Sequence, residues 1–290
     1  MNKFYIQIFF FLLNVSVYLN NKTLATEPAP GKATKQSRHC ATPEEIYAKN
    51  KHLLCANPNE TINAEKLMNE AVTHLEHNAT NNDGYKLCRC DSEFNNTFWK
   101  KTHEGDTVVQ KSVLKYYHID KYNEIINMLW DPALANEFNN GSVQRKISRV
   151  YNPNLVMIQQ RYKNSTFGRW KYFYALAAKV EISEDKAIIV MASANINDGY
   201  PSKKEYKNKI IENANLFKTD IDSEDDIRNG KLKKTFVNIA GYFIEKKNLS
   251  VYITYIESID GHTSKYQELT IEKALNKFFH YKKYIPNKNK

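Results

Sequence analysis

The sequence predicts an α+β protein with a mainly antiparallel sheet, and two observations lead to this class. First, a few segments with helical periodicity are separated by short runs rich in β-branched and aromatic residues. Second, the order along the chain is a helix, three strands, a helix pair, five or six strands and a terminal helix. Because most strands follow one another without an intervening helix, hairpin connections are favoured over parallel crossovers.

The first 25 residues form a signal peptide pattern. Lys3 precedes an apolar run over residues 4–13, and small residues at 23–25 offer a cleavage point after Ala25. The run is too short to cross a bilayer comfortably, and no later segment is long and apolar enough to do so. We therefore expect a soluble, secreted protein, with residues 26–39 as a flexible linker.

The cysteines predict two disulfides, because four cysteines in a secretory compartment are usually paired. The four are Cys40, Cys55, Cys88 and Cys90. A capping box at Thr42 begins a helix over residues 43–54, which would hold its flanking cysteines about 16–18 Å apart, too far for a bond between them. We expect Cys40 and Cys55 each to pair with Cys88 or Cys90, which would staple an N-terminal helical segment onto the first strand. A zinc site is the alternative.

Cap and strand signals place the next elements. Asn63 is a suitable N-cap for a helix over residues 64–78, whose apolar residues form one stripe. Asp120 caps a later helix that ends at Trp130, where Asp131-Pro132 interrupts it, and a short second helix is expected through Phe138. The strands between these helices are expected at residues 87–90, 97–102 and 108–117.

Strands dominate the second half of the chain, interrupted by a lysine-rich insertion at residues 202–213 that is expected to be a loop with some helix. The strands are expected at residues 143–150, 155–162, 170–182, 187–194, 231–245 and 249–258. A terminal helix follows over residues 270–284. Its apolar side is bulky, so we expect it to pack against the sheet.

The strand at residues 170–180 is apolar on both faces at its centre. One parity contains Tyr172, Tyr174 and Leu176, and the other contains Phe173 and Ala175. Alanines on a face without a helix leave space unfilled, and tyrosine hydroxyls there need partners. Spacing alone leaves two interpretations open, a filled core and a cavity for an amphipathic ligand.

Several motifs resemble those of the fam-a family of secreted malaria-parasite proteins, and the order of elements looks like that of a START-type lipid-transfer domain. The resemblance covers roughly residues 65–286. It is carried by residues 122–132, FGRWKYFYALAA at 167–178, MASANIND at 191–198, GYFIE at 241–245 and the strand from Tyr252 to Gly261. START domains often begin one strand with Arg-Asp, whereas this chain has Arg169-Trp170.

The resemblance implies a START-like helix-grip fold, in which a curved antiparallel sheet wraps around the C-terminal helix and one lipid lies between them. The lipid-binding domain would be residues 63–286, preceded by a linker and cysteine-containing helical segment at 26–62 and followed by a basic tail at 287–290. The implied function is transfer of a phospholipid, phosphatidylcholine, between membranes by a monomer. It needs no cofactor and no covalent chemistry, and the bound lipid is the cargo.

Apolar, aromatic and cationic side chains suit such a cargo, because acyl chains need burial, choline favours aromatic faces and phosphate pairs with arginine. The residues expected at the cavity are Trp130, Met157, Arg169, Trp170, Tyr172, Tyr174, Leu176, Ile253 and Tyr255, with Arg161 as an alternative phosphate partner. The residues that the family implies at the gate are Phe167, Gly168, Leu275, Phe278 and Phe279.

Charge and motifs limit the other function classes. The formal net charge of +10 favours an anionic partner, and we expect a transient contact with a membrane rather than nucleic acid. The lysines expected to help docking are Lys203, Lys204, Lys207, Lys282 and Lys283. No Walker loop, G-x-S-x-G, H-E-x-x-H or Rossmann motif indicates an enzyme. The alternative hypothesis is a secreted host-interaction or adhesion module on the same fold, without lipid transfer.

A further signal concerns destination. Residues 22–27, KTLATE, resemble the parasite export signal, although lysine replaces its arginine and the acid comes one place late. The family thus implies export into the host cell or to membranes between parasite and host.

Overall fold

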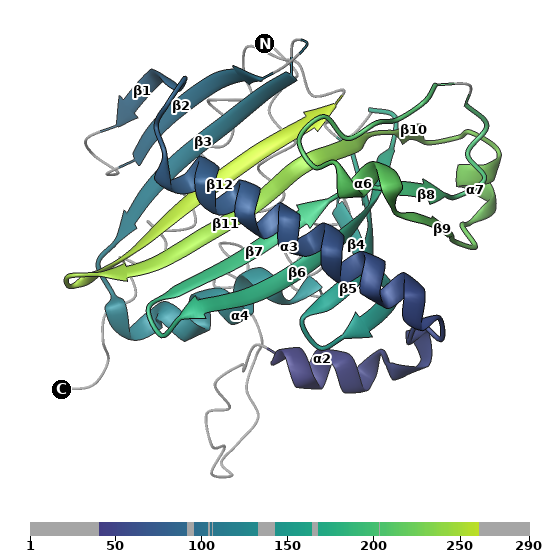
Figure 1. Ribbon diagram of the computed structural model, residues 1–290, viewed down its shortest axis with the longest axis horizontal. Helices are drawn as coiled ribbons and strands as arrows, with labels where there is room; N and C mark the ends of the chain where they lie inside the picture. Colours follow the sequence, from purple (N-terminus) through teal and green to yellow (C-terminus); the bar gives the residue numbers. More distant parts are fainter. Residues whose placement is uncertain are drawn as a thin grey trace, which may run out of the picture.

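The computed structural model describes residues 41–91, 96–103, 105, 107–132, 143–163, 168–202 and 204–260. A ten-stranded sheet forms the centre of this part of the chain (Figure 1). Neighbouring strands are antiparallel in the order β1-β2-β3-β12-β11-β7-β6-β5-β4, and the short β10 pairs with β6 in parallel. The strands are β1 (Lys86–Asp91), β2 (Asn96–His103), β3 (Thr107–Tyr116), β4 (Val143–Asn152), β5 (Leu155–Tyr162), β6 (Lys171–Ser183), β7 (Lys186–Ala192), β10 (Lys233–Lys234), β11 (Phe236–Lys247) and β12 (Ser250–Asp260). The predicted antiparallel sheet is confirmed.

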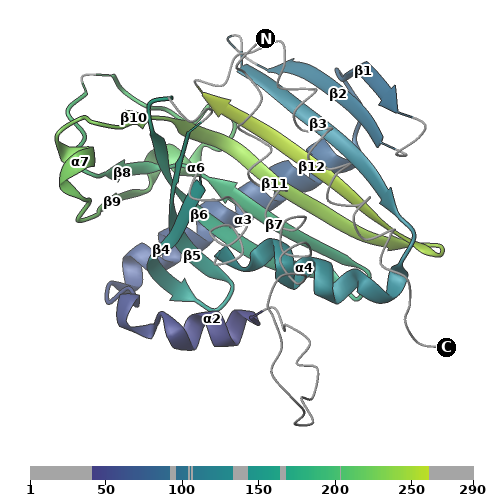
Figure 2. The same cartoon turned by 180° about the vertical axis from the view of Figure 1, so that it is seen from behind.

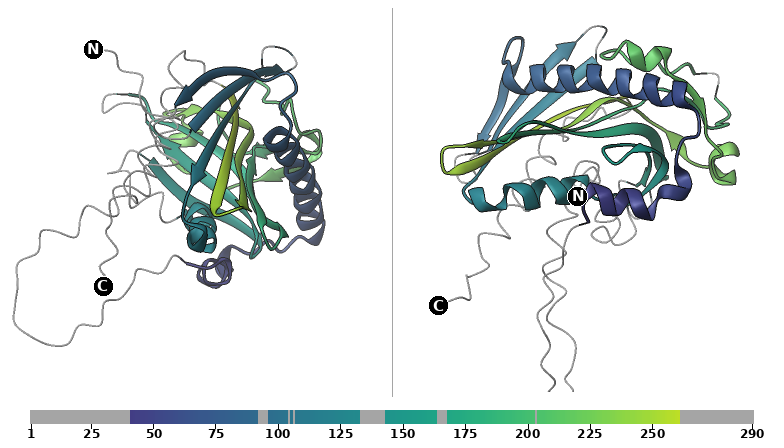
Figure 3. Two further views of the ribbon diagram at one scale, coloured as in Figure 1. Left: turned by 90° about the vertical axis from the view of Figure 1, so that its left-hand side faces the viewer. Right: turned by 60° about the horizontal axis from the view of Figure 1, so that its bottom comes forward.

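Helix α3 (Pro58–Thr80) crosses one face of the sheet, which we call the α3 face (Figures 1 and 3). It begins before the predicted start at Asn63, because the Asn57 side chain accepts hydrogen bonds from the N–H groups of Asn59 and Glu60. Gly241 on β11 lets the helix and sheet approach closely: a Cβ there would lie 2.7 Å from Leu75 Cδ1 of α3. The local cap at Asn57 therefore sets where α3 begins, and the lack of a Cβ at Gly241 allows α3 to pack closely against the sheet.

The opposite face, here the α4 face, is covered by α2 (Pro43–Lys49) and α4 (Tyr122–Trp130) (Figures 2 and 3). The capping box at Thr42 forms as predicted, and the short 3-10 helix η2 (Lys51–Leu53) follows α2. The 3-10 helix η3 (Ile119–Lys121) precedes α4. Asp120 lies within that turn, so Lys121, rather than the predicted Asp120, is the N-cap of α4.

The two helical layers explain why the central strands are apolar on both faces. On β6, Tyr172 and Leu176 belong to the core cluster beneath α3, whereas Phe173 and Ala177 belong to the cluster that includes the buried residues of α4. Side chains alternate along a strand, so each parity meets a different layer. These strands are therefore buried by helices on both faces of the sheet, rather than by helices on one face.

The segment between β7 and β10, here called the insertion, contains four small elements on either side of the loop predicted at residues 202–213. It comprises β8 (Asn195–Asn197), α6 (Asn213–Leu216), β9 (Lys218–Asp220) and α7 (Asp225–Arg228), with β8 and β9 paired in parallel. The Arg149 guanidinium on β4 donates to Glu60 Oε1 at 2.6 Å and to the Asp220 carbonyl at 2.8 Å. Together with an ion pair from Lys146 to Glu224 and a hydrogen bond from the Asn213 N–H to Glu70 of α3, the bond to Asp220 holds this insertion against the sheet and α3.

The part of the predicted staple that the structure describes, from Cys55 to β1, is not formed. The Cys55 N–H donates to the Val150 carbonyl on the edge strand β4, whereas Cys88 and Cys90 are exposed on β1 at the other edge. The 23-residue α3 lies between them in the chain and is about 35 Å long. Cys55 is a free thiol, so a bond from it to β1 is not formed; Cys40 lies outside the described residues.

Other predictions also fall outside the described residues. They are the signal peptide, the helix through Phe138, Phe167 of the gate, and the terminal helix with Leu275, Phe278 and Phe279. The docking residues Lys203, Lys282 and Lys283 and the tail at 287–290 lie there too. Among the helices that the structure describes, none has the length and apolar character needed to span a membrane.

Candidate functional site

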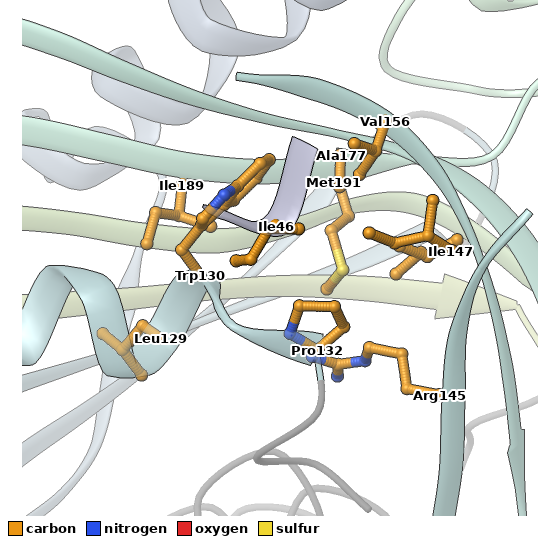
Figure 4. A pocket seen from close by; sticks show the side chains of 11 residues that line it. Ile46, Leu129, Trp130, Pro132, Arg145, Ile147, Val156, Ala177, Ile189 and Met191 are labelled. Carbon is orange, nitrogen blue, oxygen red and sulfur yellow. The ribbon is translucent and has the colours of Figure 1, made fainter. Parts of the chain in front are cut away.

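A cavity lies on the α4 face, between α4, α2 and the strands β4 to β7 (Figure 4). The cavity has a volume of about 20 Å³, which is enough for one or two water molecules and well below the volume of an ordinary small-molecule site. The lining residues are Ile46, Leu129, Trp130, Pro132, Arg145, Ile147, Val156, Ile158, Ala177, Ile189 and Met191.

Trp130, the last residue of α4, brings a polar atom to this apolar wall. Its side chain is 6% exposed and lines the cavity, where Figure 4 shows the indole beside Ile46. Its Nε1–H is buried and has no hydrogen-bond partner among the described residues. Since a buried donor without a partner costs free energy, the site offers a hydrogen bond to an acceptor in the cavity.

Arg145 on β4 brings a buried positive charge to the same wall. Its Nε donates to Gln160 Oε1 on β5 at 2.9 Å, and its Nη2 donates to the same oxygen at 2.5 Å. Burial lowers the pKa of Arg145 to about 10, although the nearby Tyr242 and Tyr255 oppose this shift. The guanidinium therefore stays charged at neutral pH, beside side chains that are mostly apolar.

Tyr242 and Tyr255 extend this polar cluster across β11 and β12. Their ring centroids lie 5.0 Å apart, and the Tyr255 hydroxyl donates to Glu257 Oε2 at 2.5 Å. Burial, with the charge of Glu257 as a further cause, raises the pKa of both phenols well above its usual range. Both tyrosines are therefore neutral hydrogen-bonding groups, and the α4 face combines a cation, a carboxylate and aromatic rings.

The predicted cavity residues divide between the two faces. Trp130, Ile253 and Tyr255 lie on the α4 face, in the same core cluster, but of these three only Trp130 lines the cavity. The prediction placed four further residues in the cavity with them, but these lie on the α3 face and are not among the residues that line the cavity. They are Met157, Tyr172, Tyr174 and Leu176.

The reason for this difference is that these side chains find their hydrogen-bond partners and packing neighbours within the protein. The Tyr172 hydroxyl donates to Asp198 Oδ2 at 2.9 Å, and Tyr174 is hydrogen-bonded to Gln159. Both phenols are buried and partnered within the protein, so they do not need a ligand. The cavity lies beneath the other parity of β6, which includes Ala177.

The two arginines that were predicted to bind a phosphate, Arg169 and Arg161, form hydrogen bonds and ion pairs within the protein instead. The exposed Arg169 donates from Nε to the Lys231 carbonyl at 3.0 Å and from Nη2 to the Gly230 carbonyl, so it ties the loop after α7 to the start of β6. Arg161 is bound by carboxylates of the insertion, including Asp226 at 2.6 Å. Trp170 packs against the α3-face core, and Gly168 lies just before β6.

Sequence reasoning missed Arg145 and Gln160 as site residues. A signal was present, because Arg145 shares its parity with Val143 and Ile147 on an alternating strand. A charged residue in the apolar register of a strand indicates a buried charge. Gln160 offers no comparable signal, since its partner lies on the neighbouring strand.

Among the comparisons with known proteins, only the comparison with solved structures finds a similarity. No protein-family model and no curated protein sequence matches this chain. The structure of human STARD10 is similar with a TM-score of 0.51 and 14% identity, over 72% of this chain and 77% of that chain. Human StAR-related lipid transfer protein 5 is similar with a TM-score of 0.49 and 10% identity, over 77% of this chain and 95% of that chain.

A third similar structure is the lipid transfer and protein localization domain of human StarD13, with a TM-score of 0.46 and 12% identity over 72% of this chain and 95% of that chain. The described residues therefore have a START-like α+β fold with a large antiparallel sheet, as predicted. At these identities the similarity concerns the fold alone.

Proposed function

We propose that this protein is a lipid carrier that binds its cargo on the α4 face and transfers it between membranes without covalent chemistry. The observation that carries the proposal is the apolar cavity with two polar groups at its wall: the Trp130 Nε1–H, which has no partner among the described residues, and the buried Arg145. The START-like fold shared with human STARD10 supports it. Apolar burial would retain the acyl chains, at about 0.8 kcal/mol for each methylene group.

A phospholipid is the cargo that this chemistry favours, and phosphatidylcholine is the first to test. A phosphate is a strong acceptor for a guanidinium such as that of Arg145, and an ester carbonyl suits the indole N–H of Trp130. A choline group favours aromatic faces, which Tyr242 and Tyr255 provide on the same side of the sheet. A neutral lipid without a phosphate would bring no anionic group to this guanidinium.

The size of the cavity also has a consequence for binding. Its inner space is too small for an acyl chain, so loading requires α4 to move away from the sheet. This nine-residue helix contacts the strands through buried apolar side chains, including Ile125 and Leu129. Apolar contacts re-form without a specific geometry, so α4 is a suitable movable wall.

The setting that we propose is a secreted monomer that belongs to the fam-a family and is exported toward host membranes, which it contacts transiently while loading and releasing lipid. The leader at residues 1–25 and the motifs quoted above support this proposal. A carrier would be useful in this setting because lipid must cross an aqueous space between membranes. The basic surface would favour contact with anionic membranes.

The test is native mass spectrometry of the purified full-length chain, followed by lipid extraction and a transfer assay with labelled phosphatidylcholine vesicles. A carrier retains one lipid per chain and exchanges it with the vesicles. Ala177→Leu, which fills the cavity, is expected to reduce bound lipid in the folded protein. Ala178→Leu is the matched control, because it overpacks the α3-face core and is expected to lower stability by about 1–3 kcal/mol without filling the cavity.

An empty wild-type protein that neither takes up nor moves lipid would refute the carrier. A secreted adhesion module on the same fold would then be the better account, because a small apolar cavity with no ligand is ordinary core. Equal lipid content in the Ala177→Leu protein and the wild type would place the cargo elsewhere than this cavity.

A further inference from the structure

A row of paired residues leads from the α4-face core to the surface. Val143 on β4 pairs with Tyr162 on β5, Tyr162 pairs with Lys171 on β6, and Lys171 pairs with Lys233 on β10. Residues paired across strands point to the same side of a sheet. The row thus begins with two buried residues of the α4-face cluster and ends with two lysines.

These two lysines are close enough to repel each other. Burial and the charge of Lys233 lower the pKa of Lys171. Like charges directly opposite in a sheet destabilise it, so the protein tolerates an unfavourable pair at this position. Among the described residues, neither lysine has a carboxylate within ion-pair distance.

Three further cations lie within two residues of this pair or of Tyr162 along the chain, and we call the whole set the basic corner. It consists of Lys163, Arg169, Lys171, Lys231 and Lys233. Arg169 fixes its shape through hydrogen bonds to the carbonyls of Gly230, Lys231 and Leu232. The neighbouring carboxylates of Glu224 and Asp226 are taken up by Lys146 and Arg161, so they do not neutralise the corner.

We propose that the basic corner is a docking surface for an anionic membrane, through which the chain approaches a bilayer with this end of the α4 face. Charge complementarity selects the partner, because lysines and arginines without counter-ions favour an anionic lipid surface. The location favours a membrane over other polyanions, since the row connects the corner with the face that binds lipid. Trp170, with Lys163 Nζ 5.2 Å from its ring centroid, adds an aromatic residue of the kind that prefers the headgroup region.

The docking surface rests on the proposed lipid-carrier function and refines it by naming the face that meets the bilayer. It differs from the sequence-based expectation, which relied on Lys203, Lys204 and Lys207 together with the terminal lysines. Lys204 Nζ lies 4.9 Å from the centroid of the Tyr206 ring, outside the row described above. The two assignments therefore predict different variants to be defective.

The test compares vesicle binding by the full-length chain and two charge-matched variants. Vesicles of phosphatidylcholine with phosphatidylserine are compared with phosphatidylcholine alone, at low and high salt. Lys171→Gln/Lys233→Gln removes two charges from the basic corner. Lys66→Gln/Lys218→Gln removes two charges from exposed lysines of α3 and β9. Circular dichroism and thermal unfolding confirm that both variants are folded.

The wild type is expected to prefer the anionic vesicles, with binding that weakens as salt rises. The basic-corner variant should bind them about thirtyfold more weakly, from the usual contribution of two lysines at an anionic surface, and the control variant should remain within about twofold of the wild type. Equal losses in the two variants would overturn the assignment, because net charge alone would then explain binding.

Three further outcomes separate this surface from its alternatives. If the wild type contains lipid but does not prefer anionic vesicles, the docking surface is wrong while the carrier function stands. If the wild type contains no lipid, the carrier function fails. If the basic-corner variant loses binding to a single-stranded oligonucleotide but not to vesicles, the partner is a nucleic acid and the membrane proposal is refuted.

Discussion

Replacing Trp130 with phenylalanine tests whether the cavity presents its indole N–H to a ligand. The change removes a buried donor that has no partner among the described residues, whose burial costs about 1–3 kcal/mol. It also removes buried apolar surface and enlarges the cavity, which costs a similar amount. The two effects oppose each other, so we expect the free energy of unfolding of the lipid-free protein to change by no more than about 1 kcal/mol.

Lipid affinity should respond differently. If a lipid oxygen accepts the Trp130 N–H, its loss costs about 1 kcal/mol and weakens binding about fivefold. The assays are urea denaturation of delipidated protein and titration with a fluorescent phosphatidylcholine. Tyr122→Phe is the matched control on the same helix: the Tyr122 hydroxyl is also buried with no partner in the described part of the chain, but Tyr122 does not line the cavity. Unchanged affinity in Trp130→Phe, or an equal loss in both variants, would refute the reasoning.

Three further predictions concern the framework around the site. Gly241→Ala should lower the free energy of unfolding by more than about 2 kcal/mol in urea titrations, because the new Cβ would lie 2.2 Å from the Ile189 carbonyl oxygen; an unchanged midpoint would contradict the close packing of α3. Burial and nearby Lys101 lower the pKa of Lys111 to about 8, so the unfolded state binds more protons above that value and stability should rise between about pH 8 and 10. Lys111→Met should abolish this rise in pH-dependent denaturation, and a rise that persists would assign it to other groups. Arg149→Ala should cost about 2 kcal/mol and speed amide exchange in β9, because the hydrogen bond to the Asp220 carbonyl is lost; unchanged exchange would show that other contacts secure the insertion.

Most strands of the sheet could be predicted from the sequence because their signals are local. β-branched and aromatic runs gave the strand at 155–162, which is β5 with the same bounds, and the strand at 97–102 lies within β2. Helix α3 was predicted with the wrong start, since Asn57 and Asn63 are both suitable caps and the Pro58 that follows Asn57 favours the earlier one. The small elements of the insertion were missed because they are short and depend on contacts with the sheet.

The site could be predicted only in part. Trp130 was found from the apolar periodicity of its helix, and the structure places it at the cavity. The tyrosines of β6 were assigned to the cavity because aromatic residues beside small ones suit a ligand, but Tyr172 has Asp198, 26 residues later in the chain, as its partner. A partner so distant in sequence leaves no trace in local spacing.

By itself, the sequence determined that the central strands are buried on both faces and that the two parities of β6 differ in character. A period of two separates the faces of a strand but does not say what covers each of them. Only the tertiary structure decided that α3 fills the Tyr172 side and that the cavity lies on the Ala177 side, with Arg145 at its wall. The same holds for Cys55 and β1, which the fold places at opposite edges of the sheet because strand order is set by long-range pairing.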